Sequence, residues 1–342
     1  MVRPKRRPNS KALVDLSGGR VTYRGGNGGP AMTETAGPEA GRVYDRSFLL
    51  SPDKRNQLME LWEVEQYGRD CFSDPSYVSL YNMPPPEWYG RGIRLLARTT
   101  LECVRDAFGD LIGRAVKGIV QASSAERVVV IDPFAGSCNA LYWVLRHLEN
   151  ARGIGCEIEQ TIATLTRKNL SCVGADIELL CGDYRTRLGH FRFPREHLLV
   201  VFVAPPWADA LDETTGLDLS RTQPPVGEIV DSVGALYRAN RLLFVTQVYE
   251  KIVRASLADY ERRFDWSEVR IYDINAAGQR HGILLGTQGW TPEPPARLRD
   301  QPDKLLINRQ TALGPLLGGD DAHHRPADAR RSKRLRPQAL AL

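Results

Sequence analysis

Apolar runs alternate with segments of helical spacing through the second half of the chain. The first such run, Val128 to Ile131, consists of four β-branched residues and predicts a buried strand. An acid, a proline and a glycine interrupt it, and apolar residues return at helical spacing from Ala140 to Leu148. Repetition of this pattern predicts strands at 127–132, 152–157, 176–181, 197–204, 241–247, 267–274 and 281–288.

Helices are predicted between these strands. Strands that are apolar throughout and alternate with helices indicate a parallel sheet with helices on both faces. The last two strands follow each other directly, which indicates an antiparallel edge. We therefore predict an α/β fold with a doubly wound, mostly parallel, seven-stranded sheet. Its helices are expected at 138–150, 159–172, 183–190, 225–239 and 248–262.

A helical extension is expected before the sheet. The shared face of Leu58, Leu61 and Trp62 predicts a helix at 52–68, and one or two more are expected within 92–120. Both ends of the chain lack apolar periodicity, which is typical of disorder. The predicted regions are a basic, Gly-rich tail at 1–42, the extension and acceptor-side segment at 43–120, the sheet domain at 121–290, and a Pro-rich, basic, largely disordered tail at 291–342.

Charge is concentrated at the two ends of the chain. The net charge is +5, but residues 1–11 carry +5 and residues 323–342 carry another +5, which leaves −5 for residues 12–322. Basic ends can add salt-dependent affinity for nucleic acid, or they can be solvated tails. The acidic remainder argues against a broad nucleic-acid groove on the domain itself.

The six cysteines form no Cys-x-x-Cys pair, and no apolar run approaches the roughly 18–20 residues of a transmembrane helix. The basic segment from Met1 to Pro8 is not followed by the apolar core of a secretory signal. We therefore expect reduced thiols, no metal site, no membrane contact and a cytoplasmic location, or a nuclear one in a eukaryote.

Acidic residues follow three of the predicted strands. Asp132, Glu157 and Asp183 end the first, second and third strand, at the edge where doubly wound sheets bind ligands. The carboxylate of Glu157 is suited to accept hydrogen bonds from two ribose hydroxyls, and that of Asp183 is suited to accept one from an adenine amino group. Gly136 allows the backbone to approach a ligand closely. Taken alone, Asp183 could equally be a helix N-cap. The ordered set is typical of an S-adenosylmethionine (SAM) methyltransferase, whereas a nicotinamide enzyme would prefer Gly-x-Gly-x-x-Gly in the first loop.

The tetrapeptide Ala204-Pro205-Pro206-Trp207 follows the fourth predicted strand. Amino-directed methyltransferases use a polar residue followed by Pro-Pro-aromatic, whose carbonyl groups accept the hydrogens of the amine. The fixed proline φ angles hold those carbonyls still and aim the nitrogen at the methyl group. The face of Trp207 suits a flat heterocycle, although a packed loop aromatic is the alternative.

Together these residues resemble the RNA cap guanine-N2 methyltransferases, the trimethylguanosine synthases, over roughly 60–290. Asp132, Phe134, Gly136 and Asn139 match the family's Asp-x-Phe-x-Gly-x-x-x-Asn loop, and Glu157-Ile158-Glu159 matches its acid–hydrophobic–acid strand end. Arg167 and Asn169 match its Arg-x-Asn motif, and Gly182-Asp183 matches its Gly-Asp motif. Pro205-Pro206-Trp207 matches Pro-Pro-Trp, and Leu217-Asp218-Leu219 stands at the family's Phe-Asp-hydrophobic motif.

The resemblance implies a Rossmann-like class I methyltransferase that uses SAM and methylates the exocyclic amine of a guanine. The cofactor-binding residues are expected to be Asp132, Phe134, Ala135, Gly136, Asn139, Glu157, Ile158, Asp183 and Ala204. The catalytic segment is Ala204, Pro205, Pro206 and Trp207, and the substrate is expected at Trp207, Asp209 and Asp218.

Two positions depart from the family pattern. Ala204 stands where the family has Ser, and Ala208-Asp209 stand where it has Gly-Gly. Ala204 keeps its carbonyl but offers no hydroxyl, and Asp209 could bind a cationic acceptor, act as a base or be solvated. Three functions therefore stay open: methylation of a guanine in RNA, methylation of a small-molecule amine or nucleoside, and a non-catalytic SAM-binding scaffold for RNA.

Overall fold

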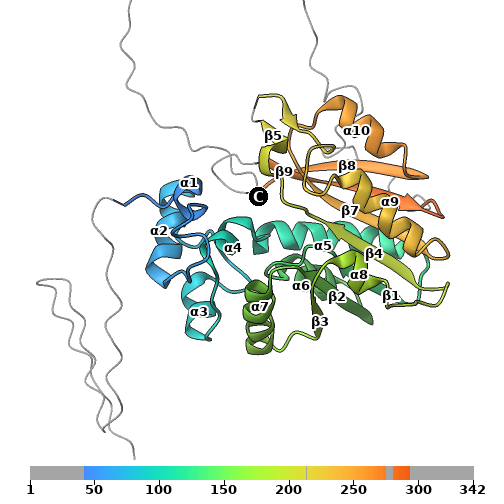
Figure 1. Ribbon diagram of the computed structural model, residues 1–342. Helices are drawn as coiled ribbons and strands as arrows, with labels where there is room; N and C mark the ends of the chain where they lie inside the picture. Colours follow the sequence, from blue (N-terminus) through green and yellow to red (C-terminus); the bar gives the residue numbers. More distant parts are fainter. Residues whose placement is uncertain (1–41, 213, 275–279, 293–342) are drawn as a thin grey trace, which may run out of the picture. The chain divides into compact units, whose positions relative to one another are not determined.

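A computed structural model describes residues 42–212, 214–274 and 280–292, so most of both predicted tails lies outside the described residues. Seven strands form one sheet in the order β3-β2-β1-β4-β7-β9-β8 (Figure 1). The strands are β1 (Val128–Asp132), β2 (Ala151–Glu157), β3 (Ile177–Cys181), β4 (Leu198–Val203), β7 (Arg241–Tyr249), β8 (Trp266–Asp273) and β9 (Arg280–Gln288). A separate two-stranded sheet is formed by β5 (Leu211–Asp212) and β6 (Gly216–Leu217).

The pairing within the large sheet confirms the predicted doubly wound, mostly parallel fold. β1 pairs in parallel with β2 and β4, β2 with β3, and β4 with β7. β9 runs antiparallel to both β7 and β8, which is the predicted antiparallel edge. The chain order reverses between β1 and β4, and this is the point where open α/β sheets bind ligands.

Helices cover both faces of the sheet, because its inner strands are apolar on both sides. Every residue of β1 and of β4 is buried. Side chains of α5 (Asp106–Gln121) and α6 (Asn139–His147) pack on one face, and those of α8 (Tyr184–Leu188), α9 (Val226–Leu236) and α10 (Arg254–Glu261) pack on the other. The 3₁₀ turn η1 (Ala208–Ala210) lies between β4 and β5.

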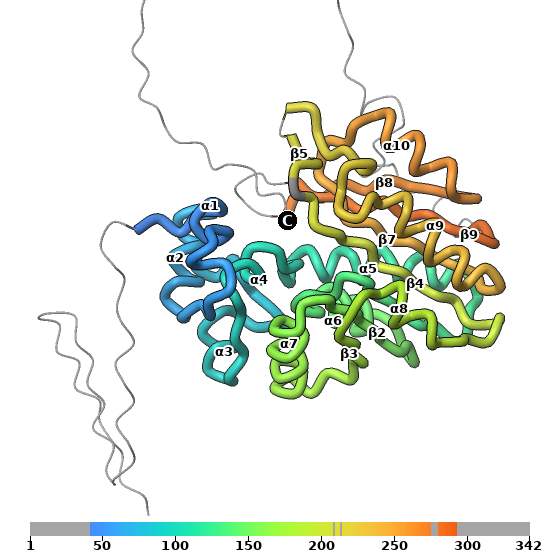
Figure 2. Tube along the Cα trace, in the orientation of Figure 1, coloured from blue at the N-terminus to red at the C-terminus, as the bar shows by residue number. Residues whose placement is uncertain are grey.

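The helical extension consists of α1 (Arg46–Leu49), α2 (Leu61–Phe72), α3 (Pro85–Gly90) and α4 (Ala97–Glu102). They lie together beside α5 and α7 (Gln160–Val173) in the tube view (Figure 2). Their apolar side chains share one core with Leu170 of α7, Leu179 of β3, and Ala135 and Cys138 of the loop after β1. The extension is therefore packed onto the loop where the cofactor was expected.

Two predicted helices were wrong in their bounds. The helix predicted at 52–68 begins only at Leu61, since Glu60 and Glu63 form a capping box there and residues 52–56 form turns. The helix predicted at 248–262 begins at Arg254, because the preceding strand continues to Tyr249 on antiparallel pairing with β9.

The side chain of Asn139 joins the extension to the sheet domain. Its Oδ1 accepts a hydrogen bond from the backbone N–H of Tyr81 (2.8 Å), and its Nδ2 donates to the carbonyl of Val104 (2.8 Å) and to Asp106 (3.1 Å). Asn139 is 1% exposed, so water cannot replace these partners. The residue lies at the first turn of α6, directly after the loop that follows β1.

We predict that Asn139→Ala lowers the free energy of unfolding by about 2–4 kcal/mol, because it leaves the N–H of Tyr81 and the carbonyl of Val104 without these buried partners and removes one donor from Asp106. Urea unfolding followed by circular dichroism measures the change. Asn56, which is exposed in a turn, provides the matched control, and Asn56→Ala is expected to change stability by less than about 0.5 kcal/mol. Equal effects of the two substitutions would contradict this role of Asn139.

Candidate functional site

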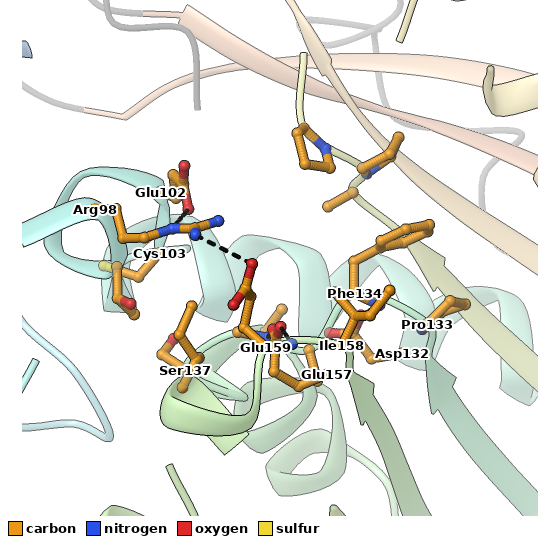
Figure 3. Close-up of a pocket in the computed structure, with 18 of the residues that line it drawn as sticks. Arg98, Glu102, Cys103, Asp132, Pro133, Phe134, Ser137, Glu157, Ile158 and Glu159 are labelled. Atoms are coloured by element: carbon orange, nitrogen blue, oxygen red, sulfur yellow. Dashed lines mark hydrogen bonds and ion pairs between the residues drawn. The ribbon is translucent and has the colours of Figure 1, made fainter. Parts of the chain in front are cut away.

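One cleft of about 480 Å³ lies at the carboxyl ends of β1, β2, β3 and β4. Its floor and one side come from the loops after these strands, and the opposite side comes from the extension (Figure 3). The lining includes all nine predicted cofactor residues, the ninth of which, Ala204, belongs to the tetrapeptide after β4, and the whole of that tetrapeptide. These are Asp132, Phe134, Ala135, Gly136, Asn139, Glu157, Ile158, Asp183, and Ala204, Pro205, Pro206 and Trp207.

The loop after β1 is folded tightly over the end of β2. The Asp132 carboxylate accepts the N–H of Phe134 (3.0 Å), and Gly136 has a positive φ of 47°. Gly155 of β2 lies under this loop, and a Cβ there would come within 2.8 Å of the Cβ of Ala135. The missing side chain at Gly155 therefore lets the loop approach the neighbouring strand, and the open space around Gly136 leaves its backbone accessible to a ligand.

Glu157 connects the ends of β1 and β2. One carboxylate oxygen accepts the N–H of Gly136 (3.1 Å), and the other accepts the N–H of Glu159 (2.8 Å). Each oxygen still has a free lone pair, because a carboxylate has about four acceptor positions. The carboxylate is thus held in a fixed orientation while it can still accept hydrogen bonds from two neighbouring hydroxyls.

Ile158 follows Glu157 and is 67% exposed, which is unusual for a large apolar side chain in the described part of this protein. It lines the cleft across from Phe134 (Figure 3). Asp183 lines the cleft as well, and its side chain caps α8 by accepting the N–H of Arg185 (2.8 Å). The N-cap interpretation of Asp183 is therefore confirmed, and the cap uses only one of its two carboxylate oxygens.

Asn139 lines the cleft, but its carboxamide is engaged by Tyr81, Val104 and Asp106. Its side chain therefore positions the loop and the extension, and all of its hydrogen-bonding groups are directed at the protein.

The carbonyl groups of the loop after β4 differ in whether they accept a hydrogen bond from the protein. The carbonyl of Pro206 accepts from Gln223 N–H (3.1 Å), and that of Trp207 accepts from Ala210 N–H (2.8 Å). Outside the ladder of the sheet, no hydrogen bond within the described residues engages the carbonyls of Ala204 and Pro205. These two oxygens, both on residues that line the cleft, are therefore not used by hydrogen bonds within the described structure.

Trp207 is more deeply packed than the sequence indicated. It is 2% exposed, and its ring stacks on His281 of β9 with centroids 6.3 Å apart and an interplanar angle of 23°. It still lines the cleft. One face of the ring is thus used by the protein, and only the remaining part can meet a ligand.

Two predicted substrate residues are not among the residues that line the cleft. Asp209 is exposed on η1. Asp218 accepts from the N–H (3.0 Å) and the hydroxyl (2.6 Å) of Ser220 in its own turn. The structure therefore brings Trp207 to the cleft but neither of these carboxylates.

The extension contributes a basic side of the cleft that the sequence did not indicate. Arg46, Arg55 and Arg98 line it, and Arg98 pairs with Glu102 and with Glu159, each at 3.6 Å (Figure 3). The Arg98–Glu159 pair joins the extension to the end of β2 across the cleft. Nothing in the sequence around these arginines distinguishes them from solvated surface charge, because their meeting depends on how the helices pack.

Gln247 was also missed. It lines the cleft from the carboxyl end of β7. The only sequence signal is a polar amide near the end of an otherwise apolar run, Leu242 to Val248, that the pattern assigns to a buried strand.

Burial raises the pKa of the carboxyl groups at the floor of the cleft. The pKa of Asp132 rises from its usual 3.8 to about 7, mainly through desolvation, against the hydrogen bond from Phe134. Desolvation also raises the pKa of Glu157, while its backbone hydrogen bonds oppose the rise. A cation bound above them would restore the charged forms, so these groups favour a positively charged ligand.

No protein-family model matches the sequence, and no curated protein matches it. Among solved structures, a Listeria monocytogenes protein described as a class I SAM-dependent methyltransferase is 13% identical, with a TM-score of 0.39. The match covers 56% of this chain and 64% of that chain, so this chain spans less than two thirds of the Listeria protein. A methyltransferase from Geobacter sulfurreducens is 16% identical (TM-score 0.34; 54% and 80% covered).

The precorrin-6y C5,15-methyltransferase from Geobacter metallireducens is 14% identical, with a TM-score of 0.35 and 51% and 86% of the two chains covered. These structural neighbours are SAM-dependent methyltransferases of various kinds, and at such identities the likeness concerns the fold alone. Within the described residues, no cluster of His, Cys, Asp or Glu could hold a metal ion, and no helix has the length and apolar character needed to cross a membrane.

We predict that Asp132→Asn gains stability relative to the wild type as the pH rises. The folded-state pKa of Asp132 lies above the unfolded value, so the wild type loses stability between pH 4 and about pH 7, while the carboxamide of the variant does not titrate and keeps an oxygen for Phe134 N–H. At about 1.4 kcal/mol per pKa unit the difference reaches up to about 4 kcal/mol. Urea unfolding of both proteins at pH 5 to 8 measures it, and a difference that does not change with pH would refute the assignment.

Proposed function

We propose that this protein is a SAM-dependent methyltransferase that transfers a methyl group to the exocyclic amine of a guanine. The observation that carries the proposal is the convergence, in one cleft, of the strand-end acids Asp132, Glu157 and Asp183 with the Pro205-Pro206-Trp207 loop. The donor and the acceptor would then lie at neighbouring strand ends, as a direct transfer requires.

The residues present fit the donor on the grounds of their chemistry. Glu157 is oriented by two backbone N–H groups and suits the two ribose hydroxyls. The exposed Ile158 and the ring of Phe134 offer apolar surface to the adenine, and Asp183 offers an acceptor to its amino group. The buried carboxyls suit a ligand that carries a positive charge.

When bound, SAM supplies a methyl group on a cationic sulfur, and in-line transfer forms a nitrogen–carbon bond as the sulfur–carbon bond breaks. The amine loses one proton to solvent as the bond forms, so no strong base is needed. The chain contributes position: the carbonyls of Ala204 and Pro205 would hold the amine hydrogens, and the fixed φ angles of the prolines keep these oxygens in place. The cleft-facing part of Trp207 would meet the flat ring.

A second candidate is a free nucleoside or another small-molecule amine. The volume of about 480 Å³ lies in the lower part of the usual range for ligand pockets, roughly 300–1,000 Å³. The donor would occupy part of this volume, so most of an RNA would lie outside the cleft. The acidic balance of residues 12–322 also favours a small acceptor over a polyanion.

We predict that Ile158→Ser weakens SAM binding about tenfold with little change in melting temperature, because the side chain is exposed in the free protein and loses apolar contact only in the complex. Isothermal titration with SAM and with S-adenosylhomocysteine measures the effect. Leu58, which is 49% exposed on the extension, provides the control Leu58→Ser, and equal binding by both variants would contradict the donor site.

The acceptor class is tested with methyl-labelled SAM offered separately with total RNA and with a nucleoside mixture. We predict label in RNA at guanine N2, at a rate that falls with salt and with removal of residues 1–41 and 323–342, whose charge is strongly basic. Label in free nucleosides that is independent of tails and salt would establish the second candidate instead. Saturable SAM binding with no transfer to either pool would refute both and leave a scaffold.

A further inference from the structure

The Nε2 atom of Gln247, a residue that lines the cleft, is a buried donor without a protein partner among the described residues. The residue is 2% exposed, and its Nε2 makes no hydrogen bond in the described structure. Buried side-chain amides are nearly always paired, because an unpaired one loses its hydration without compensation. An unpaired amide in the wall of a ligand cleft therefore points to a partner supplied by the ligand.

The register of the sheet places Gln247 beside Ala204. Val203 pairs with Thr246 in the parallel β4–β7 ladder, so the next residues along the two strands are neighbours on one face of the sheet. On the other side, Gln247 pairs with Ile283 of β9. Both flanking side chains are aliphatic, and neither can form a hydrogen bond with the carboxamide.

Charge divides the cleft into two different ends. Its charged lining residues all come from the extension and from the loops after β1, β2 and β3. The lining contributed by β4, β7 and the segments that follow β4 is neutral: Phe202, Ala204, Pro205, Pro206, Trp207, Gln223, Pro224 and Gln247. Behind Trp207, burial lowers the pKa of His281 to about 4, so this imidazole is neutral at physiological pH.

A neutral end with one unpaired amide suits a neutral, flat acceptor. It offers no carboxylate to a lysine or arginine side chain, and no cation to a phosphate. A carboxamide presents an N–H donor and a carbonyl acceptor side by side, which complements a ring edge where a carbonyl stands next to an N–H. Since the amide group turns about its terminal torsion, either atom can face the cleft.

We propose that the carboxamide of Gln247 selects the methyl acceptor by binding the adjacent N–H and C=O groups of a neutral heterocyclic base. This inference rests on the proposed methyltransferase function and specifies the acceptor side of the same cleft. In guanine these groups are N1–H and O6, and the 2-amino group beside N1 is then left for the carbonyls of Ala204 and Pro205. Gln247 is thus a specificity-determining residue, and the transfer itself needs no group from it.

The test uses two nucleosides that share the 2-amino group. Guanosine has N1–H and O6, whereas 2-aminopurine riboside lacks both. We expect the full-length protein saturated with S-adenosylhomocysteine to bind guanosine about tenfold more tightly in isothermal titration. Gln247→Leu is expected to bind guanosine as weakly as it binds 2-aminopurine riboside, with its affinity for S-adenosylhomocysteine unchanged. Equal binding of the two nucleosides by the wild type, or a preference that survives in Gln247→Leu, would overturn the proposal.

Two further variants provide a replacement for Gln247→Leu and a control. Gln247→Met is an unbranched replacement of similar length and gives the same expected loss if Gln247→Leu does not fold. Gln121→Leu, at the exposed end of α5, is the control and keeps the preference for guanosine.

The same titrations without S-adenosylhomocysteine separate this inference from the proposed function. Failure to bind SAM or S-adenosylhomocysteine refutes the methyltransferase assignment, while the nucleoside preference still decides the role of Gln247. Binding of spermidine in place of either nucleoside would show a cationic acceptor and overturn the role of Gln247.

Discussion

The hydrogen bonds of one buried amide, Asn139, hold the two halves of the cleft in place. The amide lies at the start of α6, and all three of its bonds reach segments of the extension side. The loop after β1 is consequently fixed from two directions, by the amide on one side and by Glu157 on the other. These bonds hold the loop after β1 against the side of the cleft that the extension forms.

The chemistry of the cleft changes from one end to the other for reasons that lie in the fold. Acids gather where β1, β2 and β3 end, because a parallel sheet brings the carboxyl ends of its strands to one edge. The ends of β4 and β7 lie next to the antiparallel edge, where aromatic and aliphatic side chains close the core around His281. In the proposed reaction, a charged donor and a neutral acceptor would therefore occupy one cleft without competing for the same partners.

The sequence predicted those parts of the structure that depend on local order. Apolar strand runs predicted all seven strands of the large sheet, and the motifs at the strand ends predicted twelve of the residues that line the cleft. The sequence did not predict the contacts between segments that are distant along the chain. The basic side at Arg98 depends on how α4 packs, and the burial of Trp207 depends on a histidine in the last strand. The helix predicted at 52–68 was misplaced at its start, because the shared face of Leu58, Leu61 and Trp62 does not show that a capping box of Glu60 and Glu63 starts the helix at Leu61.

The stacking of Trp207 on His281 also has a consequence for the order in which the protein is completed. His281 belongs to β9, which is inserted between β7 and β8 although it is the last strand in the described part of the chain. The strands that end at Asp132 and Glu157, and the one that Asp183 follows, are synthesised before β9. The loop that holds Trp207 has to wait for that final strand. The ring of Trp207 can therefore meet its stacking partner only after β9, the last strand of the described chain, has been synthesised.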